Sequence, residues 1–150
     1  MNDEIIFEYI TDPGLEIQEF LWAKLQQYSL SRLKNPDLEE TVSFCFTAKQ
    51  GDQIIGGMLG VIFFRGLNIQ CLWVDENYRK KGLGLQFLEK AEALAKEKHC
   101  TLIFLYSFSF QAPFFYIKAG FDIVGTIEDY PAGSNCYFLK KNMPKNASPS

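Results

Sequence analysis

Hydrophobic and polar residues recur along this chain with two different periods, and these divide it into strand-like and helix-like segments. Apolar runs that alternate with polar residues, or that are short and continuous, predict strands over residues 5–10, 42–48, 54–64, 67–74, 101–106, 121–128 and 136–140. A spacing of three to four residues predicts helices that begin near Pro13, at Gly84 and at Ala112. The segment Asn35–Pro36 predicts a further short helix or turn.

The order of these segments predicts the fold class. The strands over 42–48, 54–64 and 67–74 are joined by short turns, so we expect them to be antiparallel neighbours. A helix then joins strand 67–74 to strand 101–106, and such a crossover makes two strands parallel. We therefore predict an α/β (mixed α+β) fold with a mostly antiparallel central sheet, one parallel βαβ pair and flanking helices. Residues 1–150 are expected to form a single domain, with 143–150 as a disordered tail.

Composition narrows the classes of partner. The net charge of −3 argues against nucleic acid, because only Arg79–Lys81 is strongly basic. No apolar run is long enough to predict a membrane span, and the first residues do not resemble a secretory signal, so we expect a cytoplasmic protein without a membrane partner. Four widely spaced cysteines and one histidine predict neither a disulfide framework nor a metal site. We expect these cysteines to be reduced and mostly buried.

The stretch between strand 67–74 and the following helix carries candidate chemistry. It reads LWVDENYRKKGLG, with Arg79, Lys80 and Lys81 directly before Gly82 and Gly84. The first N–H groups of a helix lack backbone partners, and the helix dipole favours an anion there. The stretch is not a P-loop, and a dinucleotide fingerprint would need a glycine where Phe87 stands. By itself the G-x-G pattern fits either an anion site or an ordinary helix start.

Two motifs together resemble the GNAT N-acetyltransferase superfamily. Arg79-x-x-Gly82-x-Gly84 after a strand is similar to its acyl-CoA-binding signature. The later segment SFSFQAPFFYIKAGF is similar to its second conserved segment, with matches at Ala112, Tyr116 and Gly120–Phe121. Ser109 occupies the position where the superfamily has asparagine. The two motifs occur in the expected order on a βαβ unit.

The resemblance implies that acetyl-CoA is the co-substrate and assigns residues to it. The strand before the loop would diverge from the next parallel strand, with the pantetheine arm between them. The residues assigned to acetyl-CoA are Leu72, Trp73, Val74, Arg79, Lys80, Lys81, Gly82, Leu83, Gly84, Leu85, Ser109 and Ala112. Tyr116 would donate a proton or a hydrogen bond to the departing thiolate.

The general base is the role that the resemblance does not assign. Some members of the superfamily carry a glutamate on the strand before the phosphate loop. Asn68 and Gln70 stand at those positions here, and neither side chain accepts a proton. The proton of the amine would then go to solvent, to a water chain or to a carboxylate such as Glu128 or Asp129. We name Glu128 as the candidate catalytic base.

Three functions are compatible with these residues. The first is an N-acetyltransferase that acts on a primary amine of a small molecule or peptide. The second is a non-catalytic CoA-binding regulatory module, which the missing acid favours and the retained Tyr116 opposes. The third is a small nucleotide-phosphate binder. A homodimer is left open as the assembly.

Overall fold

The computed structural model describes residues 3–33 and 40–145, which belong to two compact units within residues 1–38 and 39–150. The first unit contains α1 (Leu15–Arg32), which confirms the first predicted helix. Its apolar side chains are spread around the helix rather than gathered on one face. The strand predicted over 5–10 is wrong, because these residues pair with no strand and a β-like pattern forms a strand only when a partner is hydrogen-bonded to it. The turn predicted at Asn35–Pro36 lies outside the described residues.

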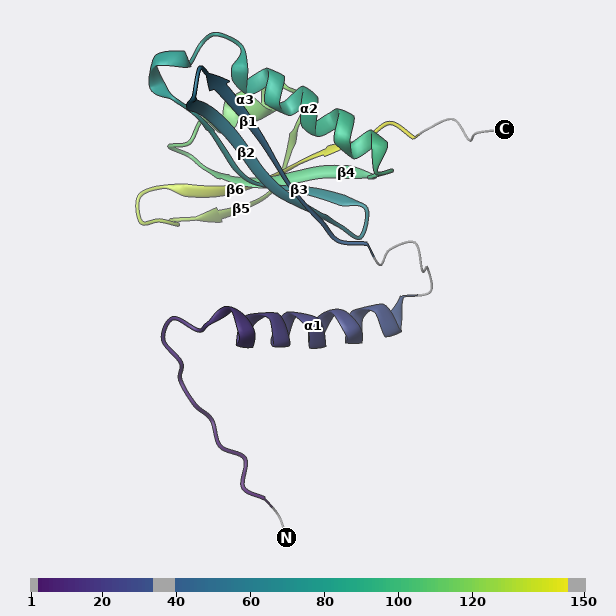
Figure 1. Ribbon diagram of the computed structural model, residues 1–150. Helices are drawn as coiled ribbons and strands as arrows, with labels where there is room; N and C mark the ends of the chain where they lie inside the picture. Colours follow the sequence, from purple (N-terminus) through teal and green to yellow (C-terminus); the bar gives the residue numbers. More distant parts are fainter. Residues whose placement is uncertain (1–2, 34–39, 146–150) are drawn as a thin grey trace, which may run out of the picture. The chain divides into compact units, whose positions relative to one another are not determined.

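The second unit is built on a six-stranded sheet. Its strands are β1 (Val42–Gln50), β2 (Gln53–Phe63), β3 (Gly66–Val74), β4 (Leu102–Phe108), β5 (Asp122–Glu128) and β6 (Asn135–Asn142). Their order across the sheet is β1-β2-β3-β4-β6-β5, as Figure 1 shows. Every neighbouring pair is antiparallel except β3 and β4, which are parallel. This arrangement confirms the predicted fold class.

Three helical segments complete this unit. The short 3₁₀ helix η2 (Glu76–Tyr78) and α2 (Leu83–Glu97) join β3 to β4, and α3 (Pro113–Lys118) joins β4 to β5 (Figure 1). The period of 3.6 residues puts one face of α2 into the core, through the buried side chains of Phe87, Leu88, Ala91 and Ala95. The same core takes in residues of the sheet and of α3, among them Met58, Leu67, Ile103, Leu139 and Tyr116. Both helices are therefore fixed to the sheet through one core.

The cysteines only partly follow the prediction. All four are free, as expected, and burial raises the pKa of the Cys100 and Cys136 thiols. Cys45 and Cys71 are exposed, so the expectation of mostly buried cysteines is wrong. Both lie on strands where successive side chains alternate between the two faces, so an apolar strand pattern alone does not assign a cysteine to the core. Among the described residues, no helix combines the length and the hydropathy needed to cross a membrane.

One ion pair links three elements. Lys141 on β6 donates from its Nζ to Glu92 Oε1 of α2 at 2.5 Å and to the carbonyl oxygen of Ala119, just after α3, at 2.9 Å. Gly120 makes room for this lysine, because a Cβ there would lie 3.3 Å from Lys141 Cε. Its φ of +98° also favours glycine. The lysine thus holds the end of α3 at a fixed distance from α2.

Replacing Lys141 with methionine should lower the free energy of unfolding by about 1–2 kcal/mol, because two charge-assisted hydrogen bonds are lost and Glu92 keeps a partly buried charge. Urea unfolding of Lys141→Met, Glu92→Gln and the double variant would measure this. We expect the two changes to be non-additive, with the double variant little worse than Lys141→Met alone. The matched control is Lys140→Met, since Lys140 makes no hydrogen bond or ion pair of its side chain with a described residue. Equal losses at both lysines would contradict the role of the pair.

Candidate active site

The parallel ladder between β3 and β4 is short. It runs from Gly66 opposite Leu102 to Asn68 opposite Phe104, and then stops. Beyond it β3 continues beside β2 as far as Val74, while β4 continues beside β6 as far as Phe108. The two strands therefore diverge, and the backbone groups of β3 that face β4 have no partner strand there. Leu72, Trp73 and Val74 lie in this diverging part.

Asn68 marks the point of divergence. Its Nδ2 donates a hydrogen bond to the carbonyl oxygen of Phe104, at 3.4 Å, across the last parallel pair. The sequence did not predict this contact of the Asn68 side chain. Since the side chain is already used to join the two strands, and an amide does not accept a proton, Asn68 is not the base.

The loop after β3 is closed by its own side chains. Arg79 Nε donates to the carbonyl oxygen of Val74 at 3.0 Å, and Asp75 accepts from the backbone N–H of Asn77 at 2.9 Å. Tyr78 donates to Gln50 Oε1 at the end of β1, and Lys81 Nζ lies 5.3 Å from the centre of the Tyr78 ring. Arg79 therefore shapes this loop in addition to the charge it provides.

The first turn of α2 presents unpaired N–H groups. Gly82 is the N-cap residue, in a left-handed conformation with φ of 81°, and its carbonyl accepts the first helical hydrogen bond from Gln86 at 3.0 Å. The N–H groups of Leu83, Gly84 and Leu85 precede the first residue that can be bonded within the helix. Together with Lys80 and Lys81, which are exposed, they can hold an anion.

Glycine is favoured at the two positions of the motif for different physical reasons. A Cβ on Gly82 would meet nothing within 4 Å, so glycine is favoured there by its positive φ. A Cβ on Gly84 would lie 3.0 Å from Cζ of the Phe115 ring on α3. From the sequence, we expected both glycines to allow a phosphate to approach the backbone closely. The structure adds that Gly84 permits close packing between α2 and α3.

Tyr116 lies on α3 at the edge of the core, with 8% of its surface exposed. Its ring makes edge contacts with Phe115 and Phe121, with ring centres 5.1 and 5.7 Å apart. Burial, and secondarily the nearby thiol group of Cys71, raises the pKa of Tyr116 to about 12. The phenol is therefore protonated at every physiological pH and can donate a hydrogen bond. No hydrogen bond within the described part of the chain uses its hydroxyl.

Cys71 was not identified from the sequence. It lies on the diverging part of β3, where the register against β2 shifts by one residue and leaves Gln70 without a partner. This bulge changes which residues of β3 share a face, and no turn residue in the sequence signals it. Its effect on the pKa of Tyr116 shows that the two groups are close.

Ser109 and Ala112 frame the turn between β4 and α3. Ser109 donates its backbone N–H to the carbonyl of Asn135 at 2.9 Å, and its hydroxyl accepts the Asn135 N–H at 3.1 Å. Ala112 is the N-cap residue of α3 in a left-handed conformation, with φ of 63°. Ser109 thus joins the end of β4 to the start of β6, and Ala112 sets the direction in which Tyr116 is presented.

Glu128 lies on a strand that is not next to the diverging pair of β3 and β4. It is the last residue of β5, an edge strand, and lies opposite Asn135 of β6. Because β6 separates β5 from β4, about 10 Å of sheet lies between Glu128 and β4. Asp129, which follows, accepts the backbone N–H of Gly133 at 2.7 Å. The assignment of Glu128 as a base stays a prediction.

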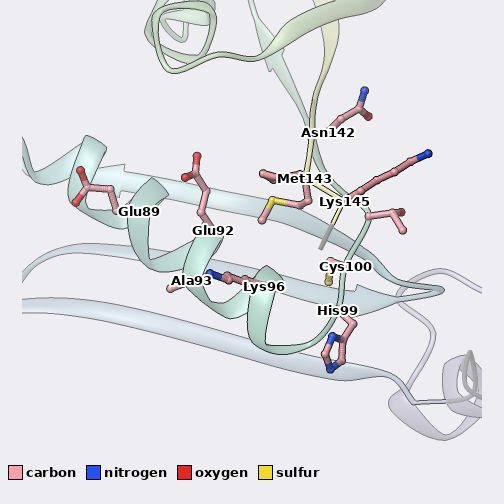
Figure 2. A pocket seen from close by; sticks show the side chains of 11 residues that line it. Glu89, Glu92, Ala93, Lys96, His99, Cys100, Asn142, Met143 and Lys145 are labelled. Atoms are coloured by element: carbon pink, nitrogen blue, oxygen red, sulfur yellow. The ribbon is translucent and has the colours of Figure 1, made fainter. Parts of the chain in front are cut away.

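A cavity of about 730 Å³ lies elsewhere, around the C-terminal half of α2. Figure 2 shows Glu89, Glu92 and Lys96 on this helix, and His99 and Cys100 just after it. It also shows Asn142 at the end of β6, with Met143 and Lys145 on the segment that follows. The helix is about 22 Å long, so its C-terminal end is far from the unpaired N–H groups at Gly82. Carbonyl groups and carboxylates there disfavour a phosphate. We place the reaction at the divergence of β3 and β4, not in this cavity.

A mixed sheet whose parallel pair diverges beside a helix that begins at a glycine, with a tyrosine on the next helix, is the arrangement that the resemblance to the GNAT superfamily implied. Residues 8–121 match the model of the acetyltransferase (GNAT) family, and the chain belongs to this family. It is an acetyl-CoA-dependent acetyltransferase. Among the described residues, no three His, Cys, Asp or Glu side chains are grouped to hold a metal ion.

Two relatives above 30% identity support this family, and a third protein shares the fold. It is 35% identical over 92 residues to blasticidin-S acetyltransferase of Streptomyces morookaense, which covers 61% of this chain and 68% of the relative. It is 38% identical to an acetyltransferase from Bacillus cereus ATCC 14579, whose crystal structure superposes with a TM-score of 0.79 over 90% of this chain and 97% of that one. A Bacillus anthracis protein crystallised with acetyl coenzyme A shares the fold, at 24% identity and a TM-score of 0.60 over 67% of this chain and 62% of that one.

The Gly84 contact predicts a coupled pair of substitutions. Gly84→Ala should lower the melting temperature and the affinity for acetyl-CoA, because the new methyl group displaces Phe115 and with it the start of α3. In a Phe115→Leu background the same change should cost much less, since the ring that it meets is gone. Gly82→Ala is the control: it has a strained φ but meets no side chain, so its cost should not depend on residue 115. Additive effects of Gly84→Ala and Phe115→Leu would show that the contact does not matter.

Proposed function

We propose that this chain is an N-acetyltransferase that transfers the acetyl group of acetyl-CoA to a primary amine of a small molecule. The observation that supports this most directly is the divergence of β3 and β4, which ends beside the first turn of α2. The pantetheine arm would lie along the backbone of Leu72, Trp73 and Val74, as an added strand partner. The pyrophosphate would take the N–H groups of Leu83–Leu85, with Lys80 and Lys81 adding positive charge.

The reaction forms a C–N bond and breaks a C–S bond. A neutral amine attacks the thioester carbonyl, the thiolate of CoA leaves, and the amine nitrogen loses one proton. Deprotonation of an alkylamine of pKa ~10.4 at pH 7 costs about 4.6 kcal/mol. Tyr116 is the side chain we assign to the leaving group: it is held by its ring contacts and is always protonated, so it can donate a hydrogen bond to sulfur as negative charge develops.

The proton of the amine goes to solvent in this proposal. Asn68 is bonded to Phe104, and neither Asn68 nor Gln70 is basic. Glu128 is separated from β4 by β6, so it is the alternative rather than the first choice for a base. A water path needs no dedicated side chain, and its kinetic signature is a rate that follows the neutral fraction of the amine.

The choice of acceptor follows from the name of a relative. Since the curated relative at 35% identity is named for blasticidin S, this small-molecule amine is the first acceptor to test. The net charge of −3 also does not favour a polyanionic acceptor.

Two measurements test the proposed function: the binding of acetyl-CoA and the formation of an acetylated product. Acetyl-CoA should raise the melting temperature, by an amount equivalent to about 2.7 kcal/mol at a hundredfold excess over its Kd, whereas ATP should not. With blasticidin S present, thiol release should be accompanied by a product heavier by one acetyl group in mass spectrometry. Gly84→Val is the control, because a side chain there disturbs the α2–α3 contact and should abolish both signals. No thermal shift at millimolar acetyl-CoA would remove the proposal.

The role of Tyr116 predicts a change in rate without a change in profile. Tyr116→Phe keeps the ring and its packing, so kcat should fall about 10²-fold with little change in the KM for acetyl-CoA. Because the pKa of Tyr116 is about 12, its ionisation does not enter the range below pH 10. The rate at low amine concentration should therefore climb from pH 7 to 9 in both proteins, in parallel. A plateau near pH 6.5 that disappears in Glu128→Gln would instead identify Glu128 as the base.

A further inference from the structure

Five aromatic side chains at the end of β4 and on the β5–β6 hairpin contact one another. We call them the aromatic surface: Tyr106, Phe108, Phe110, Tyr130 and Phe138. Phe108 lies at the centre, with ring centres 5.5 Å from Phe110, 5.5 Å from Tyr130 and 5.9 Å from Tyr106. The Phe108 and Phe110 rings are parallel to within 2°. Despite these contacts Phe110 is 64% exposed and Tyr130 53% exposed, so much of each side chain is accessible to a ligand.

The aromatic surface lies next to the divergence of β3 and β4. The parallel ladder stops at Phe104, and Tyr106 and Phe108 are the next two residues of β4 on the same side of the sheet. The core side of this strand is taken by Ile103 and Leu105, which are buried. Phe138 is opposite Tyr106 in the ladder with β6, so it extends the same side. A group seated on these rings would therefore lie beside the divergence of β3 and β4, on the face of the sheet opposite the core that contains Tyr116.

Hydrogen bonds fix the positions from which these rings project. The Phe108 N–H donates to Gln111 Oε1 at 3.1 Å, and Ser109 exchanges two hydrogen bonds with Asn135 at the start of β6. At the tip of the hairpin the Tyr130 N–H donates to the carbonyl of Ser134 at 2.9 Å. Exposed rings on a backbone held in this way can bind a ligand with little loss of conformational entropy.

The charge next to Tyr130 is negative, whereas Lys140 lies on the same side of the sheet at the other end of the aromatic surface, two residues from Phe138. Glu128 and Asp129 directly precede Tyr130 and are exposed, and one oxygen of Asp129 accepts the Gly133 N–H. An ammonium group near Tyr130 would be attracted both by these carboxylates and by the faces of the rings. A neutral or anionic planar molecule would gain the stacking but not this attraction.

We propose that the aromatic surface binds the acceptor, and that the acceptor is a cationic amine that carries a planar ring. The proposal rests on the proposed function and adds the chemical class of the substrate. Phe108, Phe110 and Tyr130 stack on the ring of the acceptor, and its primary amine reaches the thioester beside Tyr116. Glu128 acts here as a binding residue for positive charge.

The test compares two acceptors whose reacting group is in both cases a primary alkylamine. Tryptamine carries a planar ring and hexylamine does not, while both are primary alkylamines with the same charge at neutral pH. For the wild-type protein we expect a kcat/KM at least tenfold higher with tryptamine. Phe110→Leu and Tyr130→Leu should remove most of that preference by raising the KM for tryptamine more than the KM for hexylamine, with the KM for acetyl-CoA nearly unchanged.

The matched control is Phe64→Leu. Phe64 is also exposed and also contacts another ring, that of Phe63 at 5.0 Å, but it lies in the β2–β3 turn beside the start of β4, at the other end of that strand. Equal rates with both amines, or a preference that survives Phe110→Leu and Tyr130→Leu, would overturn the aromatic surface and leave the acetyltransferase function standing. Transfer to neither amine nor to blasticidin S, despite binding of acetyl-CoA, would overturn both proposals.

Discussion

The rest of the site depends on one local constraint, the end of hydrogen bonding between β3 and β4 after Asn68 and Phe104. A parallel ladder that continued to Val74 would satisfy every backbone group of β3 internally, and no extended ligand could be added there. Because each strand keeps its other neighbour, β2 or β6, the divergence costs little order in the sheet. The Asn68 amide bonds across the last pair and so fixes where the divergence begins.

The two helices on the core side must keep a fixed spacing for the site to work, since one carries the anion-binding turn and the other carries Tyr116. Two contacts set this spacing at opposite ends of the short helix. At its start, Phe115 lies against the Cα of Gly84, and after its end Lys141 joins the Ala119 carbonyl to Glu92 of α2. Neither contact touches the reacting atoms. Both act by determining where the Tyr116 hydroxyl lies relative to the first turn of α2.

Much of the fold could be predicted from the sequence, because each strand of the sheet is an apolar segment, α2 has an apolar face of helical period and α3 ends just before Gly120. The first helix, α1, was predicted from Pro13 near its start, although its apolar side chains do not gather on one face. The strand predicted over 5–10 failed for a physical reason: a β-like pattern describes a side-chain surface, and only a hydrogen-bonded partner makes it a strand. The start of α2 was also predictable, because glycines stand at a strand-to-helix junction there. Binding of an anion at this turn stays a prediction. The dual use of Arg79, the packing role of Gly84 and the proximity of Cys71 to Tyr116 were not, because they depend on side chains from elements far apart in the chain.

The raised pKa of Tyr116 also decides whether this residue can transfer its proton or can only donate a hydrogen bond. A phenol whose pKa is raised to about 12 is a much weaker acid than a thiol of pKa about 8.5, so it would give up its proton to the thiolate only at a large cost in free energy. Complete transfer to the CoA thiolate is therefore unfavourable, whereas a hydrogen bond to the developing charge costs no such transfer. The ammonium formed by attack is a much stronger acid than the phenol, so the proton that finally neutralises the thiolate comes from the amine through solvent. In this scheme Tyr116 keeps its own proton through the reaction, and its burial serves to hold that proton in place.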